Sequence, residues 1–360
     1  MYQALYRKWR PQTFADVIGQ QHITDTLRAQ LQSGRLSHAY LFTGTRGTGK
    51  TTCAKILARA VNCEHPVNGD PCNECAACRG ILDGSVLDVT EIDAASNNGV
   101  DNIRDLRDET RYTPAQVKKR VFIIDEVHML SIGAFNALLK TLEEPPEHVL
   151  FILATTELHK VPATILSRCQ RFDFRRVSSE SIVTRLGAIC VAEDVEFEGE
   201  ALDLIAHRAE GGMRNALTSL EQLIAFGEGK VTLEVAERML GGVDTSDVAE
   251  IVRAVGPRDV AACFRWTADY VETGADLAQF VRDLAEHVRN MYVLTLAGAD
   301  VALEVSDATR RELAHEMQWF GPDRLSRLLG VLGDLSAELK TSTNPRLSFE
   351  IALTRMVRPD

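Results

Sequence analysis

The chain has 360 residues and a formal net charge of −11; 45% of its residues are hydrophobic and 25% are charged. This length predicts two or three domains, and the composition is that of a globular protein, which argues against extended disorder. The longest apolar run, Val149 to Ala154, is too short to cross a bilayer, and the N-terminus lacks the apolar core of a signal peptide. We therefore expect a cytoplasmic protein with no membrane partner.

The first sixth of the chain is basic, although the whole chain is acidic. Residues 1–60 contain nine lysines and arginines and only two acidic residues. A basic segment on an acidic protein suits a phosphate-containing ligand, either a nucleotide or a DNA backbone. A solvated basic face is the alternative that charge alone leaves open.

Strand-like and helix-like patterns alternate from residue 39 to about residue 175. Apolar, β-branched runs predict strands, and amphipathic stretches such as Lys50–Asn62 and Ile132–Leu142 predict helices between several of them. The predicted strands are Ala39–Thr43, Val86–Ile92, Val121–Asp125, Val149–Thr155 and Phe172–Phe174. This alternation indicates an α/β fold, with a parallel sheet covered by helices on both faces.

The segment after the first predicted strand matches the phosphate-binding pattern G-x-x-x-x-G-K-[ST] at every position. It lies between a strand and a helix, which is the context that the pattern requires. We expect its backbone N–H groups to bind phosphates, Lys50 to reach the β- and γ-phosphates, and Thr51 to bind Mg²⁺. The predicted nucleotide-binding residues here are Gly44, Thr45, Arg46, Gly47, Thr48, Gly49, Lys50, Thr51 and Thr52.

Four cysteines lie close together after the first long helix. Cys63, Cys72, Cys75 and Cys78 fall within sixteen residues, with turn-forming residues between them. Four thiolates are enough for a closed tetrahedral Zn²⁺ site, and a cytosolic chain does not use such a cluster for disulfides. An iron–sulfur cluster is the alternative, but its usual fourth cysteine would stand where this chain has Leu82.

A second motif of the nucleotide site ends the third predicted strand. Asp125 is expected to hold the Mg²⁺ shell, and Glu126 to orient and deprotonate the water that attacks the γ-phosphate. Together with the phosphate loop, this pair predicts an ATPase that hydrolyses its nucleotide. We also expect the strand Val86–Ile92, which lies between the two motifs in the chain, to separate them in the sheet.

Helical periodicity dominates after residue 175. Apolar residues recur at helical spacing from Leu277 to Tyr292 and from Leu325 to Leu339, and glycine and Gly-Pro pairs separate these segments. We expect the two stripes to form a helical core, although one of them could also be an oligomer interface.

Several segments closely resemble the tau/gamma subunits of bacterial DNA polymerase III, a family of AAA+ clamp-loader ATPases. The four-cysteine insertion is also similar to the zinc module of that family. The segments that carry the resemblance are Ala4–Phe14, Val17–Gln20, His38–Phe42, Glu91–Ser96, Ile124–Leu130, Phe135–Pro146 and Leu166–Cys169. The resemblance is dense from residue 1 to about residue 245 and is architectural beyond it.

The resemblance implies an AAA+ domain over residues 1–176 with a zinc module at about 62–80. A helical lid over 177–242 and a helical collar for oligomerisation over 243–360 follow. The implied cofactors are ATP, Mg²⁺ and Zn²⁺. The implied function is that of a motor subunit that opens a ring-shaped sliding clamp and loads it on primed DNA during replication.

The family also implies roles for residues that the sequence patterns alone leave ambiguous. Thr155, or alternatively Thr156, would be the sensor-1 residue near the γ-phosphate, and Arg214 the sensor-2 residue of the lid. Arg168 would be an arginine finger offered to the ATP of a neighbouring subunit, although an ordinary surface ion pair would explain it as well. The implied adenine pocket is lined by Tyr6, Arg7, Pro11, Val17 and Ile18.

The implied partners are delta and delta prime subunits, further copies of this chain, the sliding clamp and primed-template DNA. DNA-directed DNA polymerase activity, a transferase reaction, belongs to the holoenzyme, because this chain carries no polymerase motif set. The long form of the family continues past the collar with polymerase- and helicase-binding segments, so we expect those activities to be absent here.

Two alternative functions remain open from the sequence. The segment from Asp125 to His128 mimics the D-E-x-H box of a helicase, which would require a second strand-containing domain after residue 175. A scaffold that does not hydrolyse ATP is the other alternative, and intact Lys50, Thr51, Asp125 and Glu126 argue against it.

Overall fold

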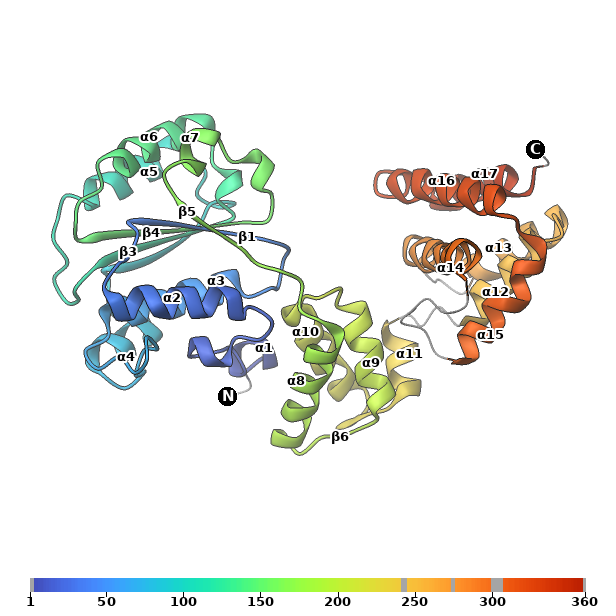
Figure 1. The fold of residues 1–360 in the computed structure, drawn as a ribbon, viewed down its shortest axis with the longest axis horizontal. Helices are drawn as coiled ribbons and strands as arrows, with labels where there is room; N and C mark the ends of the chain where they lie inside the picture. The colour runs from blue at the N-terminus through green and yellow to red at the C-terminus, as the bar shows by residue number, and fades with distance from the viewer. Residues whose placement is uncertain (1–2, 241–244, 273–275, 299–306, 359–360) are drawn as a thin grey trace. The chain divides into compact units, whose positions relative to one another are not determined.

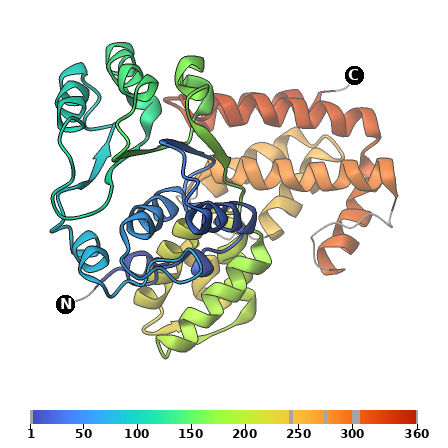
Figure 2. The same cartoon turned by 60° about the vertical axis from the view of Figure 1, so that its left-hand side comes forward.

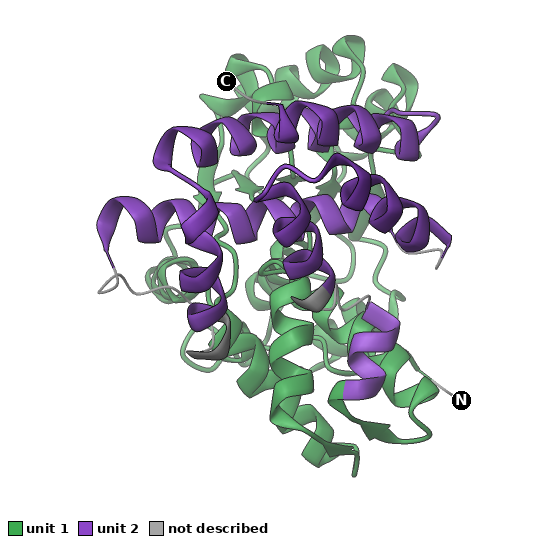
Figure 3. Ribbon diagram, turned by 90° about the vertical axis from the view of Figure 1, so that its right-hand side faces the viewer, with its two compact units in different colours: residues 1–233 green, residues 234–360 purple. Residues whose placement is uncertain are grey.

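A computed structural model describes residues 3–240, 245–272, 276–298 and 307–358. The chain forms two compact units, Met1–Leu233 and Glu234–Asp360, which are coloured separately in Figure 3.

A parallel sheet of five strands forms the centre of the first unit, in the order β2-β3-β4-β1-β5. In register, Thr43 of β1 pairs with Thr155 of β4, and Asp93 of β2 pairs with Asp125 of β3. The carboxyl-terminal ends of these parallel strands therefore lie next to one another. The strands are β1 (Ala39–Thr43), β2 (Val89–Asp93), β3 (Arg120–Asp125), β4 (Val149–Thr155) and β5 (Gln170–Asp173).

The prediction of which strand separates the two nucleotide motifs was wrong. The strand β4 lies between β1 and β3, whereas β2 lies at the sheet edge beyond β3. Every residue of β4 is buried, but no residue of β2 is fully buried. A uniformly apolar strand is favoured at the centre of a sheet and a polar one at its edge, regardless of their order in the chain.

Helices cover both faces of this sheet, as the alternation predicted (Figures 1 and 2). Successive strand residues point to opposite faces, so Tyr40 and Phe42 join one core while Leu41 joins the other. The first core includes residues of α2 (Gln21–Ser33) and α3 (Lys50–Asn62). The second includes residues of α5 (Val100–Glu109), α6 (Ile132–Glu143) and α7 (Ala163–Leu166).

Short helices connect these strands and longer helices. They are α1 (Leu5–Lys8), η1 (Phe14–Asp16), α4 (Ala76–Asp83), η2 (Val127–Met129) and η3 (Leu158–Lys160). The helix α4 lies within the four-cysteine insertion, between α3 and β2, and packs on α3. The insertion therefore extends the fold without interrupting the sheet.

A helical segment follows the sheet within the same unit. It contains α8 (Ser179–Ala192), α9 (Gly199–Arg208) and α10 (Met213–Phe226), which pack on one another. In a two-stranded parallel ribbon, β6 (Glu196–Phe197), which lies between α8 and α9, pairs with β7 (Lys230–Val231), which follows α10. The helix α10 also contacts α1, so this segment packs against the N-terminal residues of the chain.

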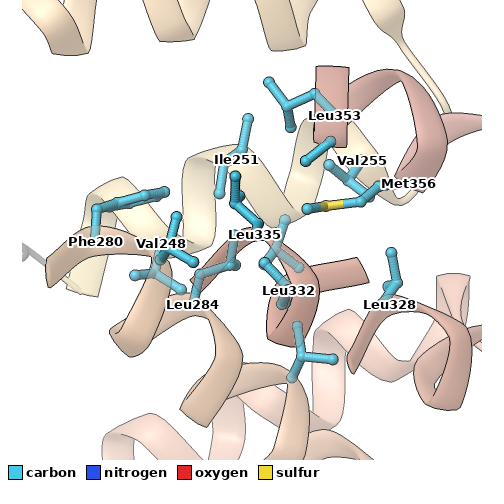
Figure 4. Close-up of a cluster of buried hydrophobic side chains, with 14 of the residues drawn as sticks. Val248, Ile251, Val255, Phe280, Leu284, Leu328, Leu332, Leu335, Leu353 and Met356 are labelled. Atoms are coloured by element: carbon cyan, nitrogen blue, oxygen red, sulfur yellow. The ribbon is translucent and has the colours of Figure 1, made fainter. Parts of the chain in front are cut away.

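All secondary-structure elements that the structure describes in the second unit are helices. Both predicted apolar stripes enter its core, where side chains from α12, α14, α16 and α17 meet (Figure 4). The elements are α11 (Leu233–Leu240), α12 (Thr245–Val255), α13 (Val260–Glu272), α14 (Leu277–Ala297), α15 (Asp307–Glu316), η4 (Met317–Trp319), α16 (Pro322–Glu338) and α17 (Pro345–Val357). Among the described helices, none combines the length and the apolar character that a membrane crossing needs.

Candidate active site

The phosphate-binding pattern forms the turn between β1 and α3. Gly44 has φ of +145°, and a Cβ there would lie 2.4 Å from the carbonyl oxygen of Phe174, so only glycine fits. Lys50 is buried and its Nζ donates to the carbonyl oxygens of Gly44 at 2.8 Å and Thr45 at 2.7 Å. Burial lowers the pKa of Lys50, and the carboxylates of Glu126 and Asp125 oppose that shift.

The two motifs of the nucleotide site meet at the carboxyl-terminal ends of β1 and β3. Thr51 Oγ1 donates to Asp125 Oδ2 at 2.7 Å, although 74 positions separate the two residues. Asp125 Oδ1 accepts from the backbone N–H of Glu126 at 2.9 Å, which orients the carboxylate. A hydroxyl and a carboxylate are the oxygen donors that Mg²⁺ takes beside substrate phosphates. Thr51 and Asp125 therefore fit the predicted Mg²⁺ site.

Glu126 follows Asp125 in a left-handed backbone conformation, with φ of +48°. This conformation is unfavourable for a residue with a Cβ, and such strain concentrates at functional sites. Glu126 Oε2 accepts from Thr156 Oγ1 at 3.0 Å and lies 3.5 Å from His128 Nδ1. The carboxylate of Glu126 is thus held beside Asp125 by a neighbouring strand end.

The two sensor-1 candidates have different surroundings. The Thr155 side chain is fully buried; its Oγ1 pairs with His128 Nδ1 at 2.9 Å and accepts from the N–H of Glu157 at 3.0 Å. Thr156, by contrast, donates directly to Glu126. The contact with the predicted water-activating carboxylate therefore belongs to Thr156.

The N-terminal segment borders the phosphate loop. Val17 is buried, and its Cγ1 would lie 3.8 Å from a Cβ on Gly49. The guanidinium of Arg7 lies 5.7 Å from the ring centre of Tyr6. The two remaining predicted residues of the adenine pocket, Pro11 and Ile18, are partly exposed.

Arg214 stands in the first turn of α10, next to the phosphate loop. Its guanidinium lies 4.9 Å from the ring centre of Tyr6. A Cβ on Gly47 would lie 3.3 Å from Gly212 Cα and 3.4 Å from Arg214 Cβ, so the backbones approach closely. The predicted lid arginine therefore lies beside the phosphate loop and contacts the predicted adenine-pocket tyrosine.

Arg168 lies just after α7 on the surface of the first unit. Its Nη2 pairs with Glu143 Oε1 at 2.7 Å, and its Nη1 donates to the carbonyl oxygen of Thr164 at 2.8 Å. The side chain is about one third exposed, at 32%. In this conformation Arg168 makes the surface ion pair that the sequence left as the alternative.

The four cysteines converge as their spacing predicted. Their sulfurs all lie within 4.8 Å of one another, compared with about 3.8 Å in an ideal tetrahedral zinc site. Backbone N–H groups point at these sulfurs, from Cys72 to Cys63 Sγ and from Cys75 to Cys72 Sγ, both at 3.3 Å. The N–H groups of Glu74 and Cys75 lower the pKa of Cys72 to about 6, whereas burial raises the pKa values of Cys63 and Cys78. The donor set therefore fits Zn²⁺.

Three residues that border the site were missed by the sequence analysis. Arg10 donates from Nε to Thr52 Oγ1 at 3.2 Å, and burial lowers its pKa. Gln20 is fully buried and joins the carbonyl oxygen of Thr48 to the backbone of Arg175. His128 contacts the strand end at Thr155. Arg10, Gln20 and His128 all lie inside segments that carry the family resemblance, and His128 also ends the D-E-x-H match, but neither signal assigned them a role at the nucleotide site.

The sheet, the phosphate loop and the Asp-Glu pair define a P-loop protein of the AAA+ class. RuvB of Thermotoga maritima, a Holliday junction branch migration motor, shares this fold with a TM-score of 0.50 and 18% identity, over 69% of this chain and 79% of that one. At that identity the likeness shows the fold alone.

Three family models match successive parts of the chain. They describe the DNA polymerase III delta subunit (residues 19–178), the ATPase lid domain of the DNA polymerase III clamp loader subunit (181–229) and domain III of the DNA polymerase III gamma and tau subunits (231–360). DNA polymerase III subunit gamma of Buchnera aphidicola is 36% identical over 99% of this chain and 96% of its own length. The chain therefore belongs to the tau/gamma family of DNA polymerase III clamp-loader subunits.

Longer relatives match over the same range. DNA polymerase III subunit tau of Bacillus subtilis is 49% identical over 99% of this chain and 63% of its own length. The tau subunit of Escherichia coli is 42% identical over 98% of this chain and 55% of its own length. The chain thus spans between half and two thirds of these two relatives.

Proposed function

We propose that this chain is the ATP-driven motor subunit of a clamp loader. It binds and hydrolyses ATP to open a sliding clamp and place it on primed DNA, together with delta, delta prime and further copies of itself. The observation that carries the ATPase part is the hydrogen bond between Thr51 and Asp125, beside Lys50 and Glu126. The family membership supports the clamp-loading part.

The proposed catalytic steps follow from this geometry. Lys50 and the N–H groups of the loop bind the phosphates, and Thr51 and Asp125 hold Mg²⁺. Glu126, oriented by Thr156, accepts a proton from the attacking water. Arg214 contacts the γ-phosphate from the lid, and Arg168 leaves Glu143 to stabilise charge at a neighbouring subunit's nucleotide.

The segment boundaries remain part of this proposal, and the one between 242 and 243 lies outside the described residues. Residues 1–176 bind the nucleotide, 177–242 form the lid and 243–360 form the collar that holds the assembly together. A helicase would need a second strand-containing domain, and the described part of the second unit contains helices and no strand. The proposal therefore places the D-E-x-H match in an ATPase site rather than in a helicase.

Steady-state ATP hydrolysis by the chain assembled with delta and delta prime subunits tests the proposal. Sliding clamp and primed DNA are added separately and together, with Lys50→Ala as the inactive control. We expect strong joint stimulation that Lys50→Ala abolishes. A rate indifferent to clamp and DNA would remove the clamp-loader function and leave only the ATPase.

A further inference from the structure

The four-cysteine module, residues 62–80, contacts the N-terminal segment through a partly buried carboxylate. Asp70 Oδ1 accepts from the backbone N–H of Phe14 at 2.5 Å. Asp70 Oδ2 accepts from Nε and Nη2 of Arg28, at 3.1 and 2.7 Å, which neutralises its charge. With 14% of its side chain exposed, Asp70 is largely withdrawn from water, so these bonds are stronger than at an open surface.

A second set of hydrogen bonds holds the N-terminal segment at Gln12, two residues before Phe14. The carbonyl oxygen of Gln12 accepts from Asn73 Nδ2 at 3.2 Å and from Arg59 Nη2 at 2.9 Å. Arg59 Nε also donates to Asn73 Oδ1 at 3.0 Å, which links the two donors. Arg59 is 3% exposed, and burial lowers its pKa to about 10, so it remains charged at neutral pH.

The N-terminal segment also contacts the nucleotide site, both before and after these residues in the chain. Before them, Arg10 donates to Thr52 beside the Mg²⁺-binding Thr51. After them, Val17 packs at Gly49 in the phosphate loop. Residues 10–13 have no helix or strand of their own, so their order depends on contacts from elsewhere in the fold.

We propose that the four-cysteine module holds residues 10–17 in the conformation that binds nucleotide, with Asp70 as a positioning residue for nucleotide binding. This inference rests on the proposed ATP-binding function. When zinc is bound, it holds the four thiolates together and so fixes the backbone that carries Asp70 and Asn73. Ordering residues 10–17 in advance spares the nucleotide the entropic cost of ordering them on binding.

Asp70→Ala in the full chain tests this inference. We expect the dissociation constant for a fluorescent ADP analogue with Mg²⁺ to rise about tenfold, which corresponds to about 1.4 kcal/mol. The ATP concentration for half-maximal hydrolysis should rise by the same factor, while the maximal rate stays within about twofold, because Glu126 and Lys50 are unchanged. Hydrogen exchange of residues 10–17 should accelerate, with zinc content unchanged.

Two further variants complete the design. Asn73→Gly retains the left-handed backbone, whose φ is +60°, and removes the two Asn73 hydrogen bonds of the second set, to Gln12 and Arg59, so it should weaken nucleotide binding in the same direction as Asp70→Ala. Glu64→Gln removes a charge from an exposed position of the same module and should leave the dissociation constant unchanged. If Asp70→Ala shows no cooperative unfolding transition, Asn73→Gly decides the question.

Nucleotide affinity within twofold of the unmodified chain in Asp70→Ala would overturn the inference. An equal loss in Glu64→Gln would overturn it as well, because the effect would then be general to the module. Failure of the unmodified chain to bind nucleotide would instead refute the proposed function.

Discussion

The two neighbouring threonines at the end of β4 give the sharpest prediction of the site. Thr156→Val removes the hydroxyl that donates to Glu126 at 3.0 Å. A hydrogen bond to a charged group contributes about 1.5 to 3 kcal/mol. If the bond orients Glu126 in the transition state, its loss should lower the maximal rate of ATP hydrolysis about ten- to one-hundred-fold. Nucleotide affinity should change little, because the phosphate loop is intact.

Thr155→Val is the matched control at the adjacent position. It leaves His128 Nδ1 and the N–H of Glu157 without their buried partner, so we expect it to lower the free energy of unfolding by about 1 to 3 kcal/mol. Its maximal hydrolysis rate should fall less than about threefold. The two variants are compared by single-turnover hydrolysis and by urea unfolding.

The opposite pattern would refute this reasoning. If Thr155→Val abolished hydrolysis while Thr156→Val retained it, the contact between Thr156 and Glu126 would have no part in catalysis. Thr155 would then be the sensor-1 residue, as the resemblance first implied.

Three more predictions follow from other contacts. Arg168→Ala should lower the hydrolysis rate of the assembled complex by about 10³-fold or more without changing nucleotide binding by the single chain; equal rates would refute a finger in trans. Asp88 is 4% exposed and pairs with Arg120 at 2.7 Å, so Asp88→Ala should cost about 3 kcal/mol in urea unfolding. Burial opposes ionisation of Asp88, but hydrogen bonds from the N–H of Gln116 and the Arg120 side chain outweigh this effect and lower the pKa of Asp88. The contribution of Asp88 to the free energy of unfolding should therefore be complete above about pH 4 and lost as the pH falls through the pKa of the folded state. A pH-independent difference between Asp88→Ala and the unmodified chain would contradict this. Phe349→Ala should destabilise the second unit by about 3 to 5 kcal/mol, because Phe349 is fully buried against Phe280; unfolding measured on the full chain checks this, and nucleotide affinity should be unaffected.

The elements around the nucleotide site could be predicted because their signals are local. The helix at Lys50–Asn62 and the strand at Ala39–Thr43 have the bounds that their periodicity predicted. Glycine spacing indicates the phosphate loop, and four cysteines at short spacing indicate a metal-binding cluster, without any knowledge of distant contacts.

The order of strands in the sheet could not be obtained in this way. Chain order says which strand comes next, but burial decides that apolar β4 is central and polar β2 is at the edge. The difference between Thr155 and Thr156 also depends on tertiary structure, because adjacent residues at a strand end point to opposite sides. The contact of Asp70 with Phe14 joins positions 56 residues apart, and no local pattern predicts it.

Transfer of a labelled sliding clamp onto primed circular DNA tests the central claim most directly. The chain is assembled with delta and delta prime subunits and supplied with ATP, with Lys50→Ala in parallel. The account predicts clamp transfer that requires both ATP and Lys50. Active ATP hydrolysis without any clamp transfer, or transfer that proceeds equally well with Lys50→Ala, would contradict it.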